Sequence, residues 1–147
     1  MNPVYLDVPG ADLDGVKYGI DFMKLANLGQ PLEVGRNVVV IGGGYTAMDC
    51  SRTSLRYGAE NVTIAYRRTR SELVVDEEEL GETEREGVNL EFLVSPIELI
   101  GEDGTDGSGD THRRVDLRVV GLVTFASILD IQGLVVFMYG LENAETW

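Results

Sequence analysis

The chain has 147 residues, a length that predicts one domain with a sizeable hydrophobic core. Its formal net charge of -13 argues against binding to nucleic acids or anionic membranes, because both need clustered cations, and no apolar run approaches the roughly 20 residues that span a bilayer. A single cysteine and a start without a basic and an apolar leader segment favour a cytoplasmic protein.

The first predicted element is a helix from Asp14 to Gly29. Its apolar stripe recurs at spacings of three and four residues and consists of Val16, Ile20, Met23 and Ala26. Asp14 is a suitable N-cap, and Gly29 followed by Pro31 predicts where the helix stops.

A strand, a turn, a helix and a second strand are predicted next. Residues 37–41 are almost purely apolar and β-branched, which is typical of a strand buried on both faces. A helix is predicted from Tyr45 to Tyr57, and the run from Asn61 to Tyr66 alternates as a strand does. Strands joined in this way pair in parallel through a right-handed crossover.

The second half of the chain predicts one more helix and further strands. The charged segment Asp76–Glu86 is compatible with a helix, and Val88–Val94 alternates as a strand. A polar, glycine-rich loop is expected over Gly101–Asp110. The segments Val115–Val119 and Ile128–Tyr139 are predicted to be antiparallel strands, which adds an antiparallel meander to the parallel sheet.

A glycine-rich motif follows the first of the paired strands. The run from Gly42 to Ala47 fits the pattern G-x-G-x-x-A of dinucleotide-binding loops. In that pattern Gly42 permits the tight turn, Gly44 lets a pyrophosphate approach the backbone, and Ala47 allows close packing of the helix. Free N–H groups at the helix start favour an anion, and Thr46 can add a hydroxyl donor. We therefore expect a Rossmann-like three-layer α/β domain; a glycine turn without a ligand and a methyltransferase-type nucleotide site are the alternatives.

The end of the second strand bears on which nucleotide binds. An NAD site usually has an acidic residue there for the ribose hydroxyls, whereas this chain has Arg67 and Arg68 and no acid before Glu72. Guanidinium groups pair with phosphate in a forked geometry, so the pattern favours NADPH, and a solvated basic turn is the alternative. The candidate cofactor-binding residues are Gly42, Gly43, Gly44, Tyr45, Thr46, Ala47, Arg67, Arg68 and Arg70.

No catalytic residue and no metal ligand is assigned in this chain. Cys50 lies on the packed face of a predicted helix, and His112 is the single histidine, so neither a metal site nor a catalytic triad can be built on them. The acidic run Asp76–Glu79 fits a solvated helix start better than a divalent metal site. Asp49 is a candidate for contact with the nicotinamide end or with a neighbouring domain.

From about Pro9 to Gly104 the chain resembles the NADPH-binding domain of the glutamate synthase small subunit family. That family includes dihydropyrimidine dehydrogenase among the FAD-dependent, pyridine nucleotide-disulfide oxidoreductase-like enzymes. The resemblance is carried by Val8–Val16, Ile20–Phe22, Val38–Arg52, Val62–Arg70, Asp76–Glu79, Glu86–Val88 and Leu93–Ile97. The family generally has Asn at the position of Tyr45 and Pro-Ala near Val74 and Val75.

The resemblance implies a two-domain flavoprotein in which NADPH bound here passes hydride to FAD in another domain. Electrons then continue to iron–sulfur clusters or a partner electron-transfer subunit. It also implies a pyrophosphate role for Gly42–Thr46 and a 2′-phosphate role for Arg67 and Arg68.

The resemblance further implies a division of the chain. Residues 1–14 are expected to be a remnant of the connection from a missing FAD domain, and residues 15–147 to form the NAD(P)H-binding domain. The resemblance fades after about residue 104, so that residues 105–147 read as an altered tail. The isolated chain is expected to be inactive, and a free-standing or truncated nucleotide-binding module without catalytic activity is the alternative.

Overall fold

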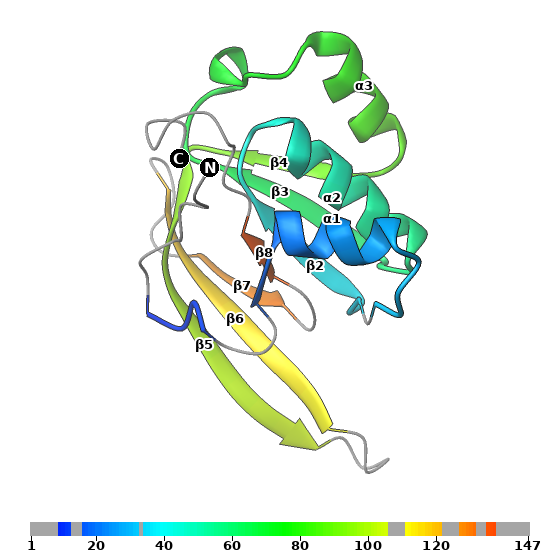
Figure 1. The fold of residues 1–147 in the computed structure, drawn as a ribbon. Helices are drawn as coiled ribbons and strands as arrows, with labels where there is room; N and C mark the ends of the chain where they lie inside the picture. The colour runs from blue at the N-terminus through cyan, green and yellow to red at the C-terminus, as the bar shows by residue number, and fades with distance from the viewer. Residues whose placement is uncertain are drawn as a thin grey trace.

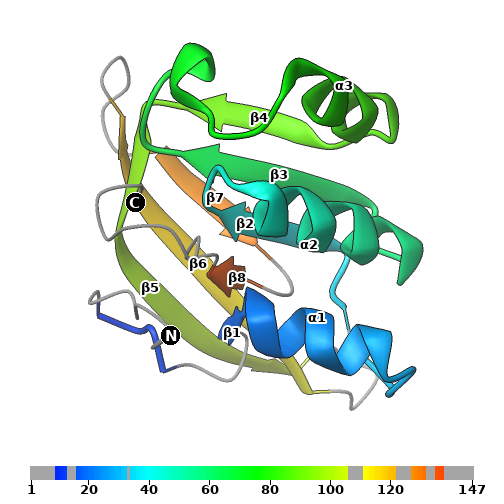
Figure 2. The same cartoon turned by 45° about the horizontal axis from the view of Figure 1, so that its top comes forward.

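The computed structural model describes residues 9–12, 16–32, 34–105, 111–121, 127–131 and 135–137. In chain order the elements are β1 (Val16–Tyr18), α1 (Gly19–Asn27), β2 (Asn37–Ile41), α2 (Tyr45–Arg56), β3 (Asn61–Tyr66), the 3₁₀ turn η1 (Arg70–Glu72), α3 (Glu77–Arg85), β4 (Asn89–Phe92), β5 (Val94–Thr105), β6 (Thr111–Gly121), β7 (Ser127–Ile131) and β8 (Val135–Phe137). They form three layers, with α1 and α2 on one face of a parallel sheet and an antiparallel sheet on the other (Figures 1 and 2).

The parallel sheet has the strand order β1-β8-β2-β3-β4. Its centre is β2, in which Val38 and Val40 are 1% and 0% exposed, as expected for a short β-branched strand covered on both faces. Val38 pairs with Val62 of β3 in parallel register. The prediction of two parallel strands joined by a helix is therefore confirmed.

The antiparallel sheet has the strand order β5-β6-β7. Leu99, Leu117 and Leu129 share one register position across the three strands, and Glu98 pairs with Arg118 one position earlier in β5. Leu99 is 3% exposed and thus belongs to the core. The predicted α/β fold with an added antiparallel meander is confirmed.

Each of the three helices contributes a large side chain to the core. Phe22 of α1, Met48 of α2 and Leu80 of α3 are each no more than 1% exposed. They pack in one cluster with Val40 of β2 and Ile64 of β3. Burying a side chain of this size contributes about 1.5–3 kcal/mol, so this cluster holds the helices on the sheet.

The segment Pro9–Asp12 is attached to β5. The N–H of Leu99 donates to the carbonyl of Pro9 at 2.8 Å. Gly10 has a φ of 86°, and a Cβ at this position would lie 2.0 Å from the carbonyl oxygen of Leu99. Only glycine therefore fits where the segment crosses the strand.

The predicted start of the first helix is wrong. Val16–Tyr18 forms β1, and α1 begins at Gly19 with Tyr18 as its N-cap; Asp14, the expected cap, lies outside the described residues. The helix is present from Gly19 onward, but the predicted stripe is not its buried face, because Ile20 is 42% exposed and Phe22 is the large side chain that α1 buries. β1 pairs with β8 near the far end of the chain, and no local pattern reveals such a long-range partner.

The predicted loop Gly101–Asp110 is also wrong in part. β5 continues to Thr105 and β6 begins at Thr111, and residues between them lie outside the described residues. Backbone pairing in the ribbon extends through glycines and charged residues because each position from Glu98 to Thr105 has a partner, for example Gly101 opposite Val115. Tertiary pairing thus overrides the weak strand propensity of this segment.

The segment Ile128–Tyr139 was predicted as one antiparallel strand and instead divides into two. β7 is antiparallel to β6, as expected, whereas β8 is parallel and lies between β1 and β2. The prediction is therefore wrong for Val135–Phe137, and Tyr139 lies outside the described residues. An apolar run without charge is typical of an interior strand of a parallel sheet, and β8 has a paired strand on each side.

Candidate functional site

The candidate site lies at the carboxyl end of β2. From this strand the chain proceeds to β3 and β4 on one side, while β8 pairs on the other side. Open α/β sheets bind ligands where the strand order reverses in this way, outside the carboxyl ends of the strands. The loop Gly42–Gly44 leaves β2 at this point and leads into α2 (Figure 2).

Gly42 makes the tight turn out of β2. Its φ is 147°, in a region that residues with a Cβ rarely adopt. Its N–H donates to the carbonyl of Ala65 at 3.1 Å, which ties the loop to β3. The backbone itself therefore requires glycine at this position.

A Cβ added at Gly43 would have a different effect from one added at Gly44. A Cβ on Gly43 would lie 2.4 Å from Cε2 of Tyr66 and 2.9 Å from Cδ2 of Leu73. A Cβ on Gly44 would have Cγ2 of Val74 as its nearest described neighbour, at 3.8 Å, which is ordinary contact. Gly43 is thus needed for packing within the protein, whereas Gly44 leaves an open approach to the backbone at the start of α2.

The N-terminus of α2 carries no competing anion among the described residues. Its N-cap is Gly44, which has no side chain to cap the helix, and its first turn contains no acidic residue. The N-terminus of α3 is the opposite case, because Asp76 accepts from the N–H of Glu79 at 2.8 Å and acidic residues fill the first turn. The dipole and N–H groups of α2 therefore remain suited to an anionic ligand.

The remaining loop residues occupy the positions that their types suggest. Ala47 is 1% exposed in the core cluster, in agreement with its predicted packing role. Thr46 is half-buried in the first turn of α2, beside the glycine loop.

Arg67 and Arg68 follow β3 directly and are half-buried. The carbonyl of Arg68 accepts from the N–H of Leu93 at 3.2 Å, which fixes the backbone of this pair against the end of β4. Both arginines thus lie at the carboxyl edge of the sheet, one strand away from the glycine loop.

Arg70 has different surroundings. Its guanidinium donates to both carboxylate oxygens of Glu84 at 3.0 and 2.9 Å and to Glu77 at 3.5 Å. The hydrogen bond with Glu84 raises the pKa of Arg70 and lowers the pKa of Glu84. The structure therefore links Arg70 to α3. In this respect Arg70 differs from Arg67 and Arg68, which follow β3 directly.

The segment between β3 and α3 folds back over the glycine loop. Tyr66 is 2% exposed, and its hydroxyl donates to the carbonyl of Glu72 at 3.1 Å. Burial raises the pKa of Tyr66. Thr69 and Glu72 form a capping box around η1, in which the N–H of Thr69 lowers the pKa of the Glu72 carboxyl. These contacts hold Leu73 and Val74 beside the glycines.

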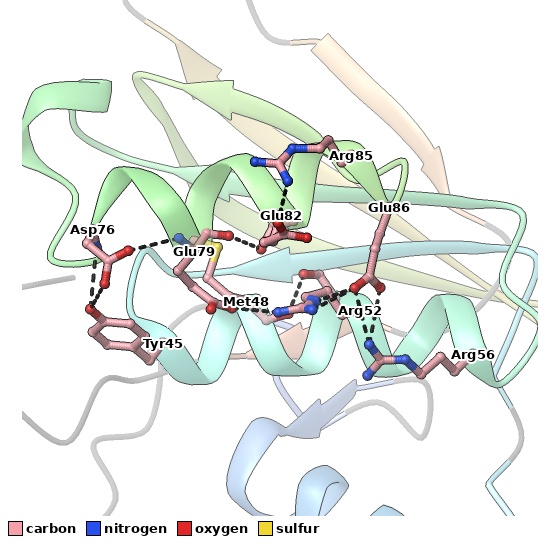
Figure 3. Close-up of polar contacts among 11 residues, drawn as sticks. Tyr45, Met48, Arg52, Arg56, Asp76, Glu79, Glu82, Arg85 and Glu86 are labelled. Atoms are coloured by element: carbon pink, nitrogen blue, oxygen red, sulfur yellow. Dashed lines mark hydrogen bonds and ion pairs between the residues drawn. The ribbon is translucent and has the colours of Figure 1, made fainter.

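Tyr45 connects the two helix starts (Figure 3). Its hydroxyl donates to Oδ2 of Asp76 at 2.8 Å and accepts from the N–H of Asp76 at 3.4 Å. The hydrogen bond raises the pKa of Tyr45, while the N–H of Glu79 and then the Tyr45 hydroxyl lower the pKa of Asp76. Sequence reasoning treated these residues separately, because nothing in their spacing indicates that they meet.

Ion pairs join the remaining turns of α2 and α3 (Figure 3). Arg52 donates to Glu79 at 2.8 Å and to Glu86 at 2.7 Å, and Arg56 donates to Glu86 at 3.2 Å. Asp49 is exposed on the same helix, and loss of solvent together with the charge of Glu79 raises its pKa. Glu79 of α3 and its C-cap residue Glu86 thus serve as partners for α2.

The other chemically interesting side chains behave as structural residues. Cys50 is 0% exposed, its thiol donates to the carbonyl of Gly19 at 3.6 Å, and burial raises its pKa, so the interpretation as a core residue is confirmed. His112 lies in β6 opposite Gly104. Within the described part of the chain, no group of three His, Cys, Asp or Glu side chains could hold a metal ion. None of the described helices is long and apolar enough to cross a membrane.

Comparison with known proteins gives one family match. A model of the pyridine nucleotide-disulphide oxidoreductase family matches residues 1–130. The chain is 44% identical over 94 residues to the NADPH-Fe(3+) oxidoreductase subunit beta of Geobacter sulfurreducens, covering 64% of this chain and 14% of that protein. It is 40% identical over 110 residues to the glutamate synthase [NADPH] small chain of Halomonas elongata, covering 67% of this chain and 23% of that protein. The chain thus spans less than a quarter of each of these relatives.

Solved structures share the fold over most of the chain. Thioredoxin reductase from T. acidophilum aligns with a TM-score of 0.67 at 16% identity, covering 94% of this chain and 41% of that one. The bacillithiol disulfide reductase of Bacillus cereus aligns with a TM-score of 0.58 at 26% identity, covering 93% of this chain and 36% of that one. The family match extends to residue 130 and these alignments cover more than nine-tenths of the chain, so the meander belongs to the shared architecture.

Proposed function

The chain belongs to the pyridine nucleotide-disulphide oxidoreductase family, and from this premise we propose that it is the NADPH-binding domain of a flavin-dependent oxidoreductase. NADPH bound here would supply hydride to an FAD held by another domain of the parent protein. One observation carries the proposal: Gly44, where a Cβ would meet no described atom closer than Cγ2 of Val74 at 3.8 Å, lies at a helix start without a capping side chain or an acid, one strand away from Arg67 and Arg68.

The glycine loop fits the pyrophosphate of a dinucleotide. Gly42 turns the chain, Gly44 carries no Cβ at the start of α2, and a helix N-terminus favours the negative charge of a phosphate. Thr46 adds a hydroxyl in the first turn of α2. In this assignment the loop binds and orients the cofactor and takes no part in proton transfer.

Arg67 and Arg68 fit the 2′-phosphate that distinguishes NADPH from NADH. The second strand of a dinucleotide fold ends beside the ribose, and β3 ends directly before this pair. Arg70 was expected to join them, but its guanidinium is hydrogen-bonded to Glu84 and Glu77. We therefore assign phosphate recognition to Arg67 and Arg68, and to Arg70 the attachment of their segment to α3.

The division of the parent protein follows the same proposal. Residues 1–14 would connect to an FAD domain, and residues 15–147 would form the NADPH domain of a cytoplasmic enzyme that passes electrons to iron–sulfur clusters or a partner subunit. Two relatives support this, because one is named a subunit beta and the other a small chain, and both are several times longer than the matched segment.

Calorimetric titration of the full chain with NADPH and NADH tests the proposal. We expect tighter binding of NADPH, and we expect Arg67→Ala and Arg68→Ala each to weaken NADPH roughly tenfold or more while changing NADH little, because charged hydrogen bonds contribute about 1.5–3 kcal/mol. Arg36→Ala is the matched control, since Arg36 precedes β2 at the other end of the strand and pairs with Glu60 at 2.9 Å. Equal affinities for the two nucleotides would contradict the assignment.

An absorbance scan of the purified chain tests which cofactor it holds. The sequence contains one dinucleotide fingerprint, at Gly42–Ala47, and the proposal gives it to NADPH. We therefore expect no flavin bands and no oxidation of NADPH with artificial acceptors. A bound flavin would show that the fingerprint holds FAD instead.

A further inference from the structure

Tyr45 occupies a position from which one side chain reaches two elements of the site. It is the first residue of α2, directly after Gly44, and its hydroxyl bonds to Asp76 at the start of α3 (Figure 3). Asp76 is at the same time the N-cap of α3. The hydrogen bond therefore ties the last residue of the segment Arg67–Asp76 to the first residue of α2.

The contacts along this segment show what the closure holds in place. Its first part is bound to β4 through the carbonyl of Arg68, and its middle is bound to Tyr66 through the carbonyl of Glu72. Leu73 and Val74 lie against Gly43 and Gly44. At its last residue the segment is joined to α2 by the bond between Tyr45 and Asp76.

We propose that Tyr45 is a positioning residue for nucleotide selection: by holding Asp76, its hydroxyl fixes the Arg67–Asp76 segment relative to the glycine loop. This inference rests on the proposed function. NADPH must engage the glycine loop and the arginines together, whereas NADH engages the loop alone. A group that fixes the arginines relative to the glycine loop therefore contributes to NADPH binding by preorganisation. It contributes less to NADH binding.

Removal of the hydroxyl tests the inference with two independent measurements. Tyr45→Phe keeps the ring, and Asp76→Ser keeps an N-cap for α3 while withdrawing the carboxylate from Tyr45. We expect both variants to weaken NADPH roughly three- to tenfold and NADH less than about twofold. Tyr57→Phe is the matched control, because the Tyr57 hydroxyl donates to the carbonyl of Ala26 at the other end of α2.

Limited trypsin digestion without nucleotide supplies the second measurement. Trypsin cleaves after arginine, so cleavage after Arg67, Arg68 and Arg70, assigned by mass spectrometry, reports how firmly the segment is held. We expect cleavage there to be roughly three- to tenfold faster in Tyr45→Phe and Asp76→Ser than in the wild type or Tyr57→Phe, because opening follows the lost local stability.

The outcomes separate this inference from the proposed function. A wild type that does not prefer NADPH would overturn the proposed function, and with it the nucleotide-selection role, while the digestion would still report whether Tyr45 holds the segment. If the wild type prefers NADPH, unchanged digestion or an unchanged ratio of the two affinities in Tyr45→Phe would overturn the inference alone. Equal losses for both nucleotides would also overturn it, because they would place the effect on the glycine loop.

Discussion

The ring of Tyr66 fills the space where Gly43 would carry a side chain, with Cε2 only 2.4 Å from the ideal Cβ position. Because Tyr66 is itself 2% exposed and its hydroxyl is bonded to Glu72, the ring cannot move aside at low cost. The middle glycine of the loop is therefore a requirement of the protein's own packing. At Gly44, by contrast, a Cβ would meet Cγ2 of Val74 at 3.8 Å, an ordinary contact, so packing against the described residues does not require glycine there.

Alanine at Gly43 should therefore mainly lower stability, whereas alanine at Gly44 should mainly weaken NADPH binding. Gly43→Ala should lower the free energy of unfolding by about 1–3 kcal/mol, because it overpacks a buried contact. Gly44→Ala should cost less than about 1 kcal/mol, as expected for alanine at an N-cap, yet weaken NADPH roughly tenfold or more by placing a methyl group where the pyrophosphate approaches. Urea denaturation and calorimetric titration measure the two effects. Comparable losses of stability in both variants would contradict the assignment.

A second pair of glycines tests whether the start of the chain is part of the folded domain. Gly10→Ala combines a φ of 86° with a Cβ 2.0 Å from the carbonyl oxygen of Leu99, whereas Gly29→Ala has a φ of 64° with no atom within 4 Å. Gly29→Ala should cost about 1–2 kcal/mol from backbone strain alone. Gly10→Ala should cost about 1–3 kcal/mol more, because of the added clash. Thermal or urea unfolding of the two variants gives the difference, and equal losses would mean that Pro9–Asp12 is not held on β5.

The sequence was sufficient for the elements in which local pattern and tertiary structure agree. β2 is β-branched and apolar because it is covered on both faces, and α2 begins after a glycine loop that ends the strand. The same agreement located the glycine loop and the basic pair after β3. In such segments the chemical requirement lies within a few neighbouring residues, so a single sequence displays it.

The parts that could not be predicted depend on partners far away in the chain. Val16 begins a strand because Val135 pairs with it, and neither segment reveals the other. The bond between Tyr45 and Asp76 likewise joins residues with no periodic relation. The assignment of Arg70 to the cofactor followed from its place in a basic cluster, whereas its position opposite Glu84 depends on how α3 packs. Charge in the sequence indicates what a residue can bind, and the fold decides which partner is near.

Cys50 should be unreactive towards thiol reagents in the folded protein. It is 0% exposed and burial raises the pKa of its thiol, so the reactive thiolate is both rare and inaccessible. Labelling with a chromogenic disulfide reagent should be slow in buffer and complete within the mixing time in urea. Cys50 is the only cysteine of the chain, so the whole signal belongs to it. Rapid, stoichiometric labelling in buffer would mean that α2 opens readily from the sheet.

The ion pairs between α2 and α3 should make stability depend on pH in the acidic range. The hydrogen bond from Arg52 lowers the pKa of Glu86 below its ordinary value of 4.5. The unfolded chain therefore takes up the proton first as the pH falls. The contribution of Glu86 to stability is complete above pH 4.5 and is lost as the pH falls through the lower pKa of the folded state.

Arg52→Met should weaken this pH dependence, because Arg56 still pairs with Glu86, and should lower the free energy of unfolding. The side chain of Arg52 is 21% exposed, so we expect a loss of about 1–2 kcal/mol at pH 7, between the values for exposed and buried ion pairs. Below pH 4.5 the difference in unfolding free energy between Arg52→Met and the wild type should shrink, because protonated Glu86 carries no charge to pair with Arg52. Arg85→Met is the matched control, since Arg85 pairs within α3 with Glu82 and should change stability by less than about 0.5 kcal/mol. Urea denaturation from pH 7 to pH 3 measures both variants, and a loss for Arg52→Met that stays constant with pH would show that the guanidinium acts through packing.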